Sequence, residues 1–195
     1  RVNLVGKIQL KNILMAVIAA SKSNLDLQKI FSVIPKLSPV KGRFEQIGKI
    51  KNKSLVFLDY AHSPGALQTC IQNIREQFPH KHISVLFGCG GDRDKGKRSK
   101  MGKIADKYAD KIYLTDDNPR YEDPKKIRKD IKKGINNKKI IEISDRSKAI
   151  LKAIKNLNSG EILLVAGKGH EKTQDLGDKK IYFSDKKVIL DSIKK

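Results

Sequence analysis

The sequence predicts an α/β fold with a doubly wound, mostly parallel sheet, and two observations support this. Short apolar runs bounded by turn-forming residues occur at 83–87, 112–115 and 162–166, and such runs are typical of strands buried on both faces. Segments with helical spacing separate the runs, and alternating strands and helices with short connections build a parallel sheet. We therefore expect these strands to be parallel, with their carboxyl ends at one edge.

Two helices and a linker are expected in the first part of the chain. Residues 11–22 are apolar nearly all round, so a helix here needs burial on several sides. Asp26 can cap a second, shorter helix, and two prolines then mark a linker that ends at Gly42. Residues 1–41 are thus expected to be the tail of a preceding domain plus a linker, and residues 42–195 a domain of their own.

The expected elements of residues 42–195 follow one another at short intervals. A strand over 44–50 turns at Lys51-Asn52-Lys53 into a strand over 55–58. A helix over 64–77 begins with a proline, whose missing N–H is harmless in the first helical turn. The remaining elements are a strand over 83–87, a helix over 99–108 capped by Ser99, a strand over 112–115, a helix from Pro124, a strand over 140–143, a helix from a cap at Asp145 to about 157, a strand over 162–166, an irregular hairpin ending at 181–183 and a helix from Ser184 or Asp185.

Length and composition limit the class of protein. The 195 residues suffice for one domain and part of another. No apolar stretch reaches the roughly 20 residues of a membrane-spanning helix, and the first residues lack the pattern of a secretory signal, so a cytoplasmic location is expected. Two cysteines, Cys70 and Cys89, are too few for a disulfide framework and lack zinc spacing. Cys89 lies in a glycine-rich loop, where a reactive role is an open alternative.

The net charge of +21 raises the alternative of a basic nucleic-acid-binding module. The arrangement of the basic residues argues against that alternative. Lysines are scattered over every segment, and the sparse aromatic residues are not interleaved with them as stacking platforms. A lysine-rich solvated surface explains the charge, and nucleic acid is not an expected partner.

Three loops should meet at one edge of the sheet, where open α/β sheets bind their ligands. These loops carry Arg93, Arg120 and Glu171, and two guanidiniums with a carboxylate suit a ligand that has both carboxylate and ammonium groups. Pro119 fixes its own φ and restricts Asn118 before it, so Arg120 is presented in a defined direction. The alternative for this segment is a turn that only starts the next helix.

Two further segments lie at the same predicted edge. The glycine-rich loop 88–98 lets backbone N–H groups approach a ligand, but it lacks the Walker order, and a tight strand-to-helix turn explains it equally well. His62 can contact a nucleotide, act as an acid or base, or simply brace its loop. The sequence contains neither a nucleophile–base pair nor a metal-binding cluster, so no residue is assigned to catalysis or to a metal.

Taken together, these motifs resemble the C-terminal domain of the Mur ligases. The resemblance starts at Gly42-Arg43-Phe44-Glu45, continues in family order through 59–64, 88–98, 116–120 and 167–171, and covers about residues 42–190. Leu4-Val5-Gly6 with Asn12-Ile13-Leu14 resembles the end of the family's central ATPase domain. The resemblance implies that residues 1–41 are a helical remnant of that domain and residues 42–195 an amino-acid-binding domain.

The resemblance implies an ATP-dependent amide ligase of cytoplasmic peptidoglycan precursor synthesis. ATP phosphorylates the glutamate carboxylate of UDP-N-acetylmuramoyl-L-alanyl-D-glutamate, and an amine of the incoming amino acid attacks the acyl phosphate. In the family, the central domain binds most of ATP and Mg²⁺, so this chain alone is expected to be inactive. The intact enzyme is expected to be a monomer without a membrane partner. A folylpolyglutamate synthetase-like domain, which shares the architecture, is the nearest alternative.

Two groups of site residues follow from the resemblance. The amino-acid group is implied to be Arg93, Asp117, Asn118, Pro119, Arg120, Gly167 and Glu171. The nucleotide group is implied to be Asn12, Arg43, Asp59 and His62. Meso-diaminopimelate differs from lysine by a second carboxylate, and the members of the family that add it carry Asp-Asn-Pro-Arg, as at 117–120 here. Arg120 therefore predicts meso-diaminopimelate, with Glu171 or Asp117 available for its distal ammonium.

Overall fold

The computed structural model describes residues 4, 6–50, 53–136 and 140–194. Val5, Lys51 and Asn52, which belong to the motif and the turn named above, lie outside the described residues. The chain divides into two compact units, Arg1–Val40 and Lys41–Lys195. No helix in the described ranges is both long and apolar enough to span a bilayer.

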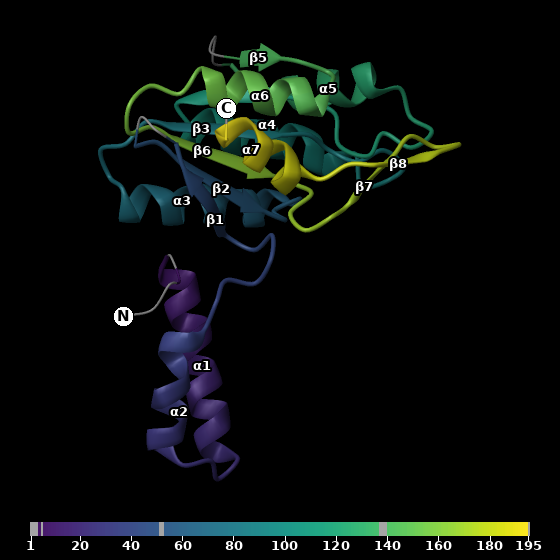
Figure 1. Ribbon diagram of the computed structural model, residues 1–195. Coiled ribbons are helices and arrows are strands. Elements are labelled where there is room, and N and C mark those ends of the chain that lie inside the picture. Colours follow the sequence, from purple (N-terminus) through teal and green to yellow (C-terminus); the bar gives the residue numbers. More distant parts are fainter. Residues whose placement is uncertain (1–3, 5, 51–52, 137–139, 195) are drawn as a thin grey trace. The chain divides into compact units, whose positions relative to one another are not determined.

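The first unit is a pair of helices that lie side by side (Figure 1). Helix α1 spans Lys7–Lys22, α2 spans Leu27–Val33, and a 3-10 turn, η1, spans Ile34–Lys36. The predicted cap is confirmed, because the Asp26 carboxylate accepts a hydrogen bond from Lys29 N at 3.0 Å. The burial that the apolar α1 requires is not provided within this fully described pair, since Leu10 and Met15 are 67% and 68% exposed.

The second unit contains a six-stranded sheet in its described residues, in the order β1-β2-β6-β3-β4-β5 (Figure 1). The strands are β1 Glu45–Lys49, β2 Leu55–Asp59, β3 Ile83–Phe87, β4 Lys111–Leu114, β5 Ile140–Glu142 and β6 Ile162–Ala166, and a separate hairpin pairs β7 Thr173–Asp175 with β8 Lys180–Tyr182. All pairings in the sheet are parallel except β1 with β2. The predicted mostly parallel α/β fold is confirmed.

Helices cover both faces of this sheet (Figure 1). They are α3 Pro64–Gln77, α4 Gly96–Tyr108, α5 Pro124–Lys132, α6 Arg146–Lys155 and α7 Asp185–Ile193. Helices α6 and α7 pack against a core that includes Val56, Leu86 and Val165, while α3, α4 and α5 pack side by side on the other face. Every residue of β3 and β6 is buried, including the polar Ser84 of β3, as their largely apolar runs predict.

One predicted helix start is wrong. Helix α4 begins at Gly96 and not at Ser99, and Lys95 at the cap position makes no side-chain hydrogen bond. The helix begins early because Asp94 Oδ1 accepts a hydrogen bond from Gly96 N at 2.8 Å. The predicted cap at Asp145 is confirmed, and the last helix begins at Asp185, one of its two predicted starts, with Ser184 as its cap.

The cap of α6 allows a modest stability prediction. Asp145→Ala should lower the free energy of unfolding by about 1 kcal/mol, because the exposed carboxylate accepts a hydrogen bond from Lys148 N at 3.0 Å. Asp145→Asn, which keeps an acceptor oxygen, should retain most of that stability. Urea denaturation of the three proteins measures the difference, and equal midpoints for the alanine variant and the parent would contradict the expectation.

Candidate functional site

Four loops meet at the carboxyl edge of the parallel strands. They follow β2, β3, β4 and β6 and cover residues 59–64, 88–95, 116–122 and 167–171. Backbone hydrogen bonds join them, since Gly91 N donates to Asn118 O at 2.9 Å. In the same way, Gly167 N donates to Asp59 O at 3.1 Å. Because β2 and β3 both run parallel to β6, the expectation that their loops share one edge is confirmed.

Arg93 and Arg120 both lie beside Gly90. A Cβ atom at this glycine would be 2.9 Å from Arg120 Nη1 and 3.9 Å from Arg93 Cγ. Arg120 Nη1 donates to Gly91 O at 2.7 Å, and Arg120 Nε lies 3.7 Å from Asp175 Oδ2. The Nη2 atom of Arg120 has no hydrogen bond to the described part of the chain. The guanidinium is thus anchored on one side, which leaves Nη2 available for a ligand.

The rest of the 117–120 segment is held tightly. Asp117 Oδ1 accepts a hydrogen bond from Asn118 N at 2.7 Å, and Pro119 is buried. A Cβ atom at Gly167 would lie 2.9 Å from Asp117 Oδ2, so these two members of the amino-acid group are adjacent. Helix α5 has its own cap, Asp123, which accepts a hydrogen bond from Lys125 N at 2.9 Å. The segment is therefore not needed to start the helix.

Asn118 and Glu171 are joined through a buried lysine. Asn118 Nδ2 donates to Glu171 Oε2 at 3.1 Å. Lys168 Nζ donates to both residues, at 2.8 Å to Asn118 Oδ1 and 2.8 Å to Glu171 Oε2. The Lys168 side chain has no exposed surface, whereas that of Glu171 is 30% exposed. Asn118 also fixes the hairpin, because its Oδ1 accepts a hydrogen bond from Asp175 N at 3.0 Å.

Three side chains of the second unit surround Tyr60. The Arg43 guanidinium lies 4.6 Å from the centre of the Tyr60 ring, a cation–π distance. The His62 ring lies 4.6 Å from the Tyr60 ring, and the His170 ring 5.3 Å. Arg43 and His62 are exposed, so both can reach a ligand at this edge. The structure therefore brings two members of the nucleotide group together.

The other two members of the nucleotide group are Asp59, which is buried, and Asn12, which belongs to the first unit. Asp59 is only 8% exposed, and its Oδ2 accepts a hydrogen bond from Phe44 N at 2.6 Å. Its Oδ1 accepts another from Ala61 N at 2.7 Å. Asp59 therefore shapes the turn that carries His62. Asn12 is exposed on α1, in the first unit.

The loop 167–171 connects the two groups. Gly42 and Gly169 both have positive φ angles, 67° and 52°. A Cβ atom at Gly42 would lie 2.2 Å from His170 N, and one at Gly169 would lie 2.7 Å from Gly42 O. Side chains are excluded at both positions, so the segment before Arg43 packs directly on the loop that carries Lys168.

Buried ion pairs fix the elements behind this edge. Arg146 and Asp185 have no exposed side-chain surface, and Arg146 Nε lies 2.8 Å from Asp185 Oδ1. Burial opposes the charge of Arg146, but the neighbouring Asp185 carboxylate raises its pKa overall. Arg146 Nη2 also donates to Ala166 O at 2.9 Å, at the end of β6. Burial raises the pKa of Asp116 above its ordinary value, although its ion pair with Arg128 opposes this shift.

Cys89 lies at the start of the glycine-rich loop but is buried. Its Sγ lies 3.6 Å from Met101 Sδ, and only 3% of the residue is exposed. Burial raises the pKa of its thiol to about 12. The thiol is therefore protonated at neutral pH, and the alternative of a reactive Cys89 is not supported.

Comparison with known proteins identifies the family of this chain. Residues 42–169 match the model of the Mur ligase family described as the glutamate ligase domain. The chain belongs to the Mur ligase family. The resemblance inferred from the sequence motifs is thereby confirmed.

Individual Mur ligases provide closer comparisons. UDP-N-acetylmuramoyl-L-alanyl-D-glutamate--2,6-diaminopimelate ligase of Rickettsia typhi is 45% identical over 95% of this chain. The ligase of the same name from Wolinella succinogenes is 42% identical over 98% of the chain. The chain spans 37% and 43% of the lengths of these two relatives.

Solved structures show the same relationship. A structure of UDP-N-acetylmuramoyl-L-alanyl-D-glutamate--2,6-diaminopimelate ligase covers all of this chain with a TM-score of 0.77 and 36% identity, and the chain covers 40% of that protein. Folylpolyglutamate synthase of Thermotoga maritima covers 85% of the chain with a TM-score of 0.64 and 21% identity, and the chain covers 37% of it. The second likeness concerns the fold alone.

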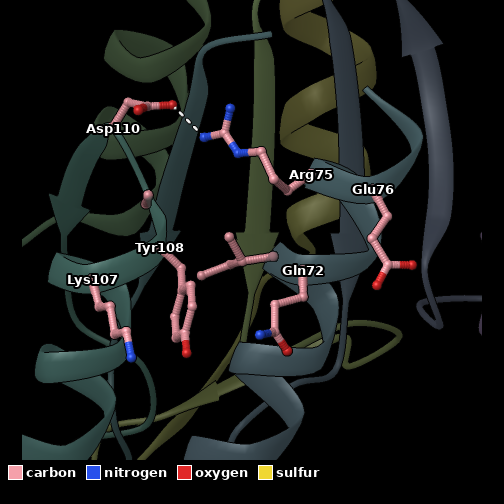
Figure 2. Close-up of a pocket in the computed structure, with 8 residues that line it drawn as sticks. Gln72, Arg75, Glu76, Lys107, Tyr108 and Asp110 are labelled. Carbon is pink, nitrogen blue, oxygen red and sulfur yellow. Dashed lines mark hydrogen bonds and ion pairs between the residues drawn. The ribbon is translucent and has the colours of Figure 1, made fainter. Parts of the chain in front are cut away.

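A hollow of about 460 Å³ lies away from the Mur ligase motifs, between α3 and α4 (Figure 2). Gln72, Arg75, Glu76, Lys107, Tyr108 and Asp110 line it. Arg75 Nη2 lies 2.7 Å from Asp110 Oδ2. Burial alone would raise the pKa of Asp110, but hydrogen bonds from Ile83 N and Arg75 lower it overall. Asp110 directly precedes β4, so the hollow lies at the amino edge of the parallel strands, opposite the four loops.

Sequence reasoning missed two residues within the Mur ligase motifs. Lys168 is part of the last motif, but a lysine between two glycines is expected to be solvated. Tyr60 is part of the motif that follows β2, and its neighbours Arg43 and His170 are distant in the sequence. The only sequence signal for either residue is its position inside a motif.

Proposed function

We propose that this chain supplies the amino-acid-binding domain of a ligase that adds meso-diaminopimelate to UDP-N-acetylmuramoyl-L-alanyl-D-glutamate in the cytoplasm. The observation that carries the proposal is the arrangement of cation and carboxylate at one sheet edge. Arg120 offers Nη2, and Glu171 is 30% exposed beside Asn118. A guanidinium and a carboxylate suit an amino acid that has a carboxylate and an ammonium at its far end.

The choice between amino acids rests on Arg120. Lysine has no distal carboxylate, so its binding would leave the guanidinium without an anion. A site built to pair a polar group rejects an analogue that lacks it, because the buried group then stays unpaired. Glu171 or Asp117 would receive the distal ammonium. These contacts favour meso-diaminopimelate over lysine.

The nucleotide group supports an ATP-dependent reaction. Arg43 and His62 are exposed side chains that can donate hydrogen bonds to the nucleotide. Asp59 positions both, because it accepts hydrogen bonds from Phe44 N, next to Arg43, and from Ala61 N, next to His62. Among the described residues, no cluster of three or more acidic, His or Cys side chains could hold a metal ion. On the strength of the family resemblance, we assign Mg²⁺ and most ATP contacts to the part of the longer relatives that this chain does not match, and Asn12 to the edge of that region.

A chimeric ligase tests the proposal. In this protein, the chain replaces the matching segment of the Rickettsia typhi ligase. The chimeric ligase should release phosphate from ATP only when Mg²⁺, the UDP-linked dipeptide and meso-diaminopimelate are all present. The isolated chain should release none under the same conditions.

Other outcomes of this experiment would contradict specific parts of the proposal. Turnover by the isolated chain would contradict our assignment of Mg²⁺ and ATP. A folded chimeric ligase that shows no activity with meso-diaminopimelate would contradict the proposed substrate. NMR titration of the chain with meso-diaminopimelate, L-lysine and L-glutamate provides an independent check, since a folylpolyglutamate synthetase-like domain should respond to glutamate instead.

A further inference from the structure

Lys168 is a charged side chain with no exposed surface at the centre of the amino-acid group. Burying an ammonium is costly unless polar partners replace its water. Both partners of Lys168 Nζ, Asn118 Oδ1 and Glu171 Oε2, belong to that group. This burial therefore serves the arrangement of those two side chains.

The hydrogen bonds allow only one orientation of the Asn118 amide. Its Oδ1 accepts hydrogen bonds from Lys168 Nζ and from Asp175 N, so a flip would place an NH₂ group against two donors. The Nδ2 atom must then point to Glu171 Oε2. One Nδ2 proton of Asn118 is used in this contact, and the second remains.

The same bonds orient the carboxylate of Glu171. Its Oε2 accepts from both Lys168 and Asn118, whereas its Oε1 has no hydrogen bond to the described residues. Only Oε1 can therefore accept a hydrogen bond from a ligand without breaking an existing contact. The side chain is 30% exposed, so this oxygen is accessible.

We propose that Lys168 is a positioning residue for the incoming amino acid. Its ammonium locks Asn118 and Glu171 so that Glu171 Oε1 and the second Nδ2 proton of Asn118 face the ligand as a fixed acceptor and donor. This inference rests on the proposed function, because the ligand is an amino acid with an ammonium group. Lys168 itself does not touch the ligand.

Lys168 lies on a loop that contacts both the amino-acid group and the nucleotide group, so the inference predicts an effect on amino-acid binding alone. Gly169 and His170, next to Lys168, pack on Gly42 and Tyr60 and hence on the nucleotide group. Lys168 Nζ, in contrast, contacts only the amino-acid group within the described part of the chain. Loss of its ammonium should affect amino-acid binding, whereas general loosening of the loop should affect the nucleotide as well.

Lys168→Met in the chimeric ligase separates these two effects. We expect KM for meso-diaminopimelate to rise about ten- to thirtyfold, the size of one lost hydrogen bond to a charged group. KM for ATP should stay within about twofold, because contacts of the nucleotide group are unchanged. Lys168→Gln, which keeps two N–H donors, should recover part of the loss. Lys172→Met is the matched control, because it removes an exposed lysine close by on the same segment.

Equal increases in both KM values would show a structural role and overturn the inference, as would no increase in either. A chimeric ligase that fails with the parent chain would instead count against the proposed function. In that case, NMR of the isolated full chain decides. The Asn118 side-chain amide should exchange slowly with solvent in the parent and at least about tenfold faster in Lys168→Met, with a smaller increase in Lys168→Gln. Unchanged exchange in folded variants would overturn the inference without reference to activity.

Discussion

Arg120→Ala should lower kcat/KM of the chimeric ligase for meso-diaminopimelate by roughly two orders of magnitude or more, a loss of about 3 kcal/mol. The expected loss is large because the charge-assisted contact of Arg120 Nη2 with the distal carboxylate disappears. Activity with L-lysine, which lacks that carboxylate, should fall much less. Steady-state kinetics with both amino acids measure the two losses.

The anchoring of Arg120 requires a control for loop integrity. Arg120 Nη1 donates to Gly91 O at 2.7 Å, so the side chain also ties two loops together. Arg120→Lys keeps a cation but loses the planar guanidinium that presents Nη2 to the ligand, and it should lose much of the preference for meso-diaminopimelate. If Arg120→Ala lowered activity equally for both amino acids, the residue would stabilise the loops and would not determine which amino acid is used.

Asp185→Ala should destabilise the protein by about 3–5 kcal/mol, because it leaves a buried guanidinium without its counter-ion. Asp185 Oδ1 and Oδ2 each lie 2.8 Å from nitrogen atoms of Arg146, and neither side chain is exposed. Water cannot reach Arg146 to compensate. Urea denaturation of the full chain should show the loss as a lower midpoint.

Two further variants test whether the loss of stability comes from the unpaired buried charge. The double variant Arg146→Met with Asp185→Leu removes both charges and should recover most of the stability, because apolar replacement of a buried pair is often neutral. Lys186→Ala breaks the ion pair with Glu45, in which the lysine is 40% exposed, and should cost at most about 1 kcal/mol. If Asp185→Ala cost no more than Lys186→Ala, the buried pair would not be a principal stabilising contact.

Some elements of the fold can be read directly from the sequence. The runs at 83–87 and 162–166, apolar except for Ser84, predict β3 and β6 with their observed bounds, because a strand covered on both faces is mostly apolar. The start of a helix that has a side-chain cap, such as α6 with Asp145, is also predictable from the sequence. The start of α4 is not predictable in this way, because the Lys95 side chain at its cap position makes no capping hydrogen bond. Its start depends on Asp94, which lies one residue before the cap position and accepts a hydrogen bond from Gly96 N.

The candidate site is predictable only in part. Strand polarity alone places Arg120 and Glu171 at one edge, since both follow parallel strands. The burial of Lys168 depends on Asn118, which is far away in the sequence, so local composition cannot indicate it. The ring of Tyr60 acquires its neighbours only when the segment at Arg43 folds back onto the edge.

The contact between Gly42 and Gly169 has a mechanical consequence. Backbone atoms meet there with no side chain between them, and repulsion between such atoms rises steeply with overlap. The contact is therefore stiff, and it cannot absorb a displacement as a flexible side chain would. A side chain at either glycine would therefore push the loop that carries Lys168 and Glu171 away from the segment before Arg43. The backbone of Gly42 is thereby a fixed boundary for the loop whose residues would hold the incoming amine.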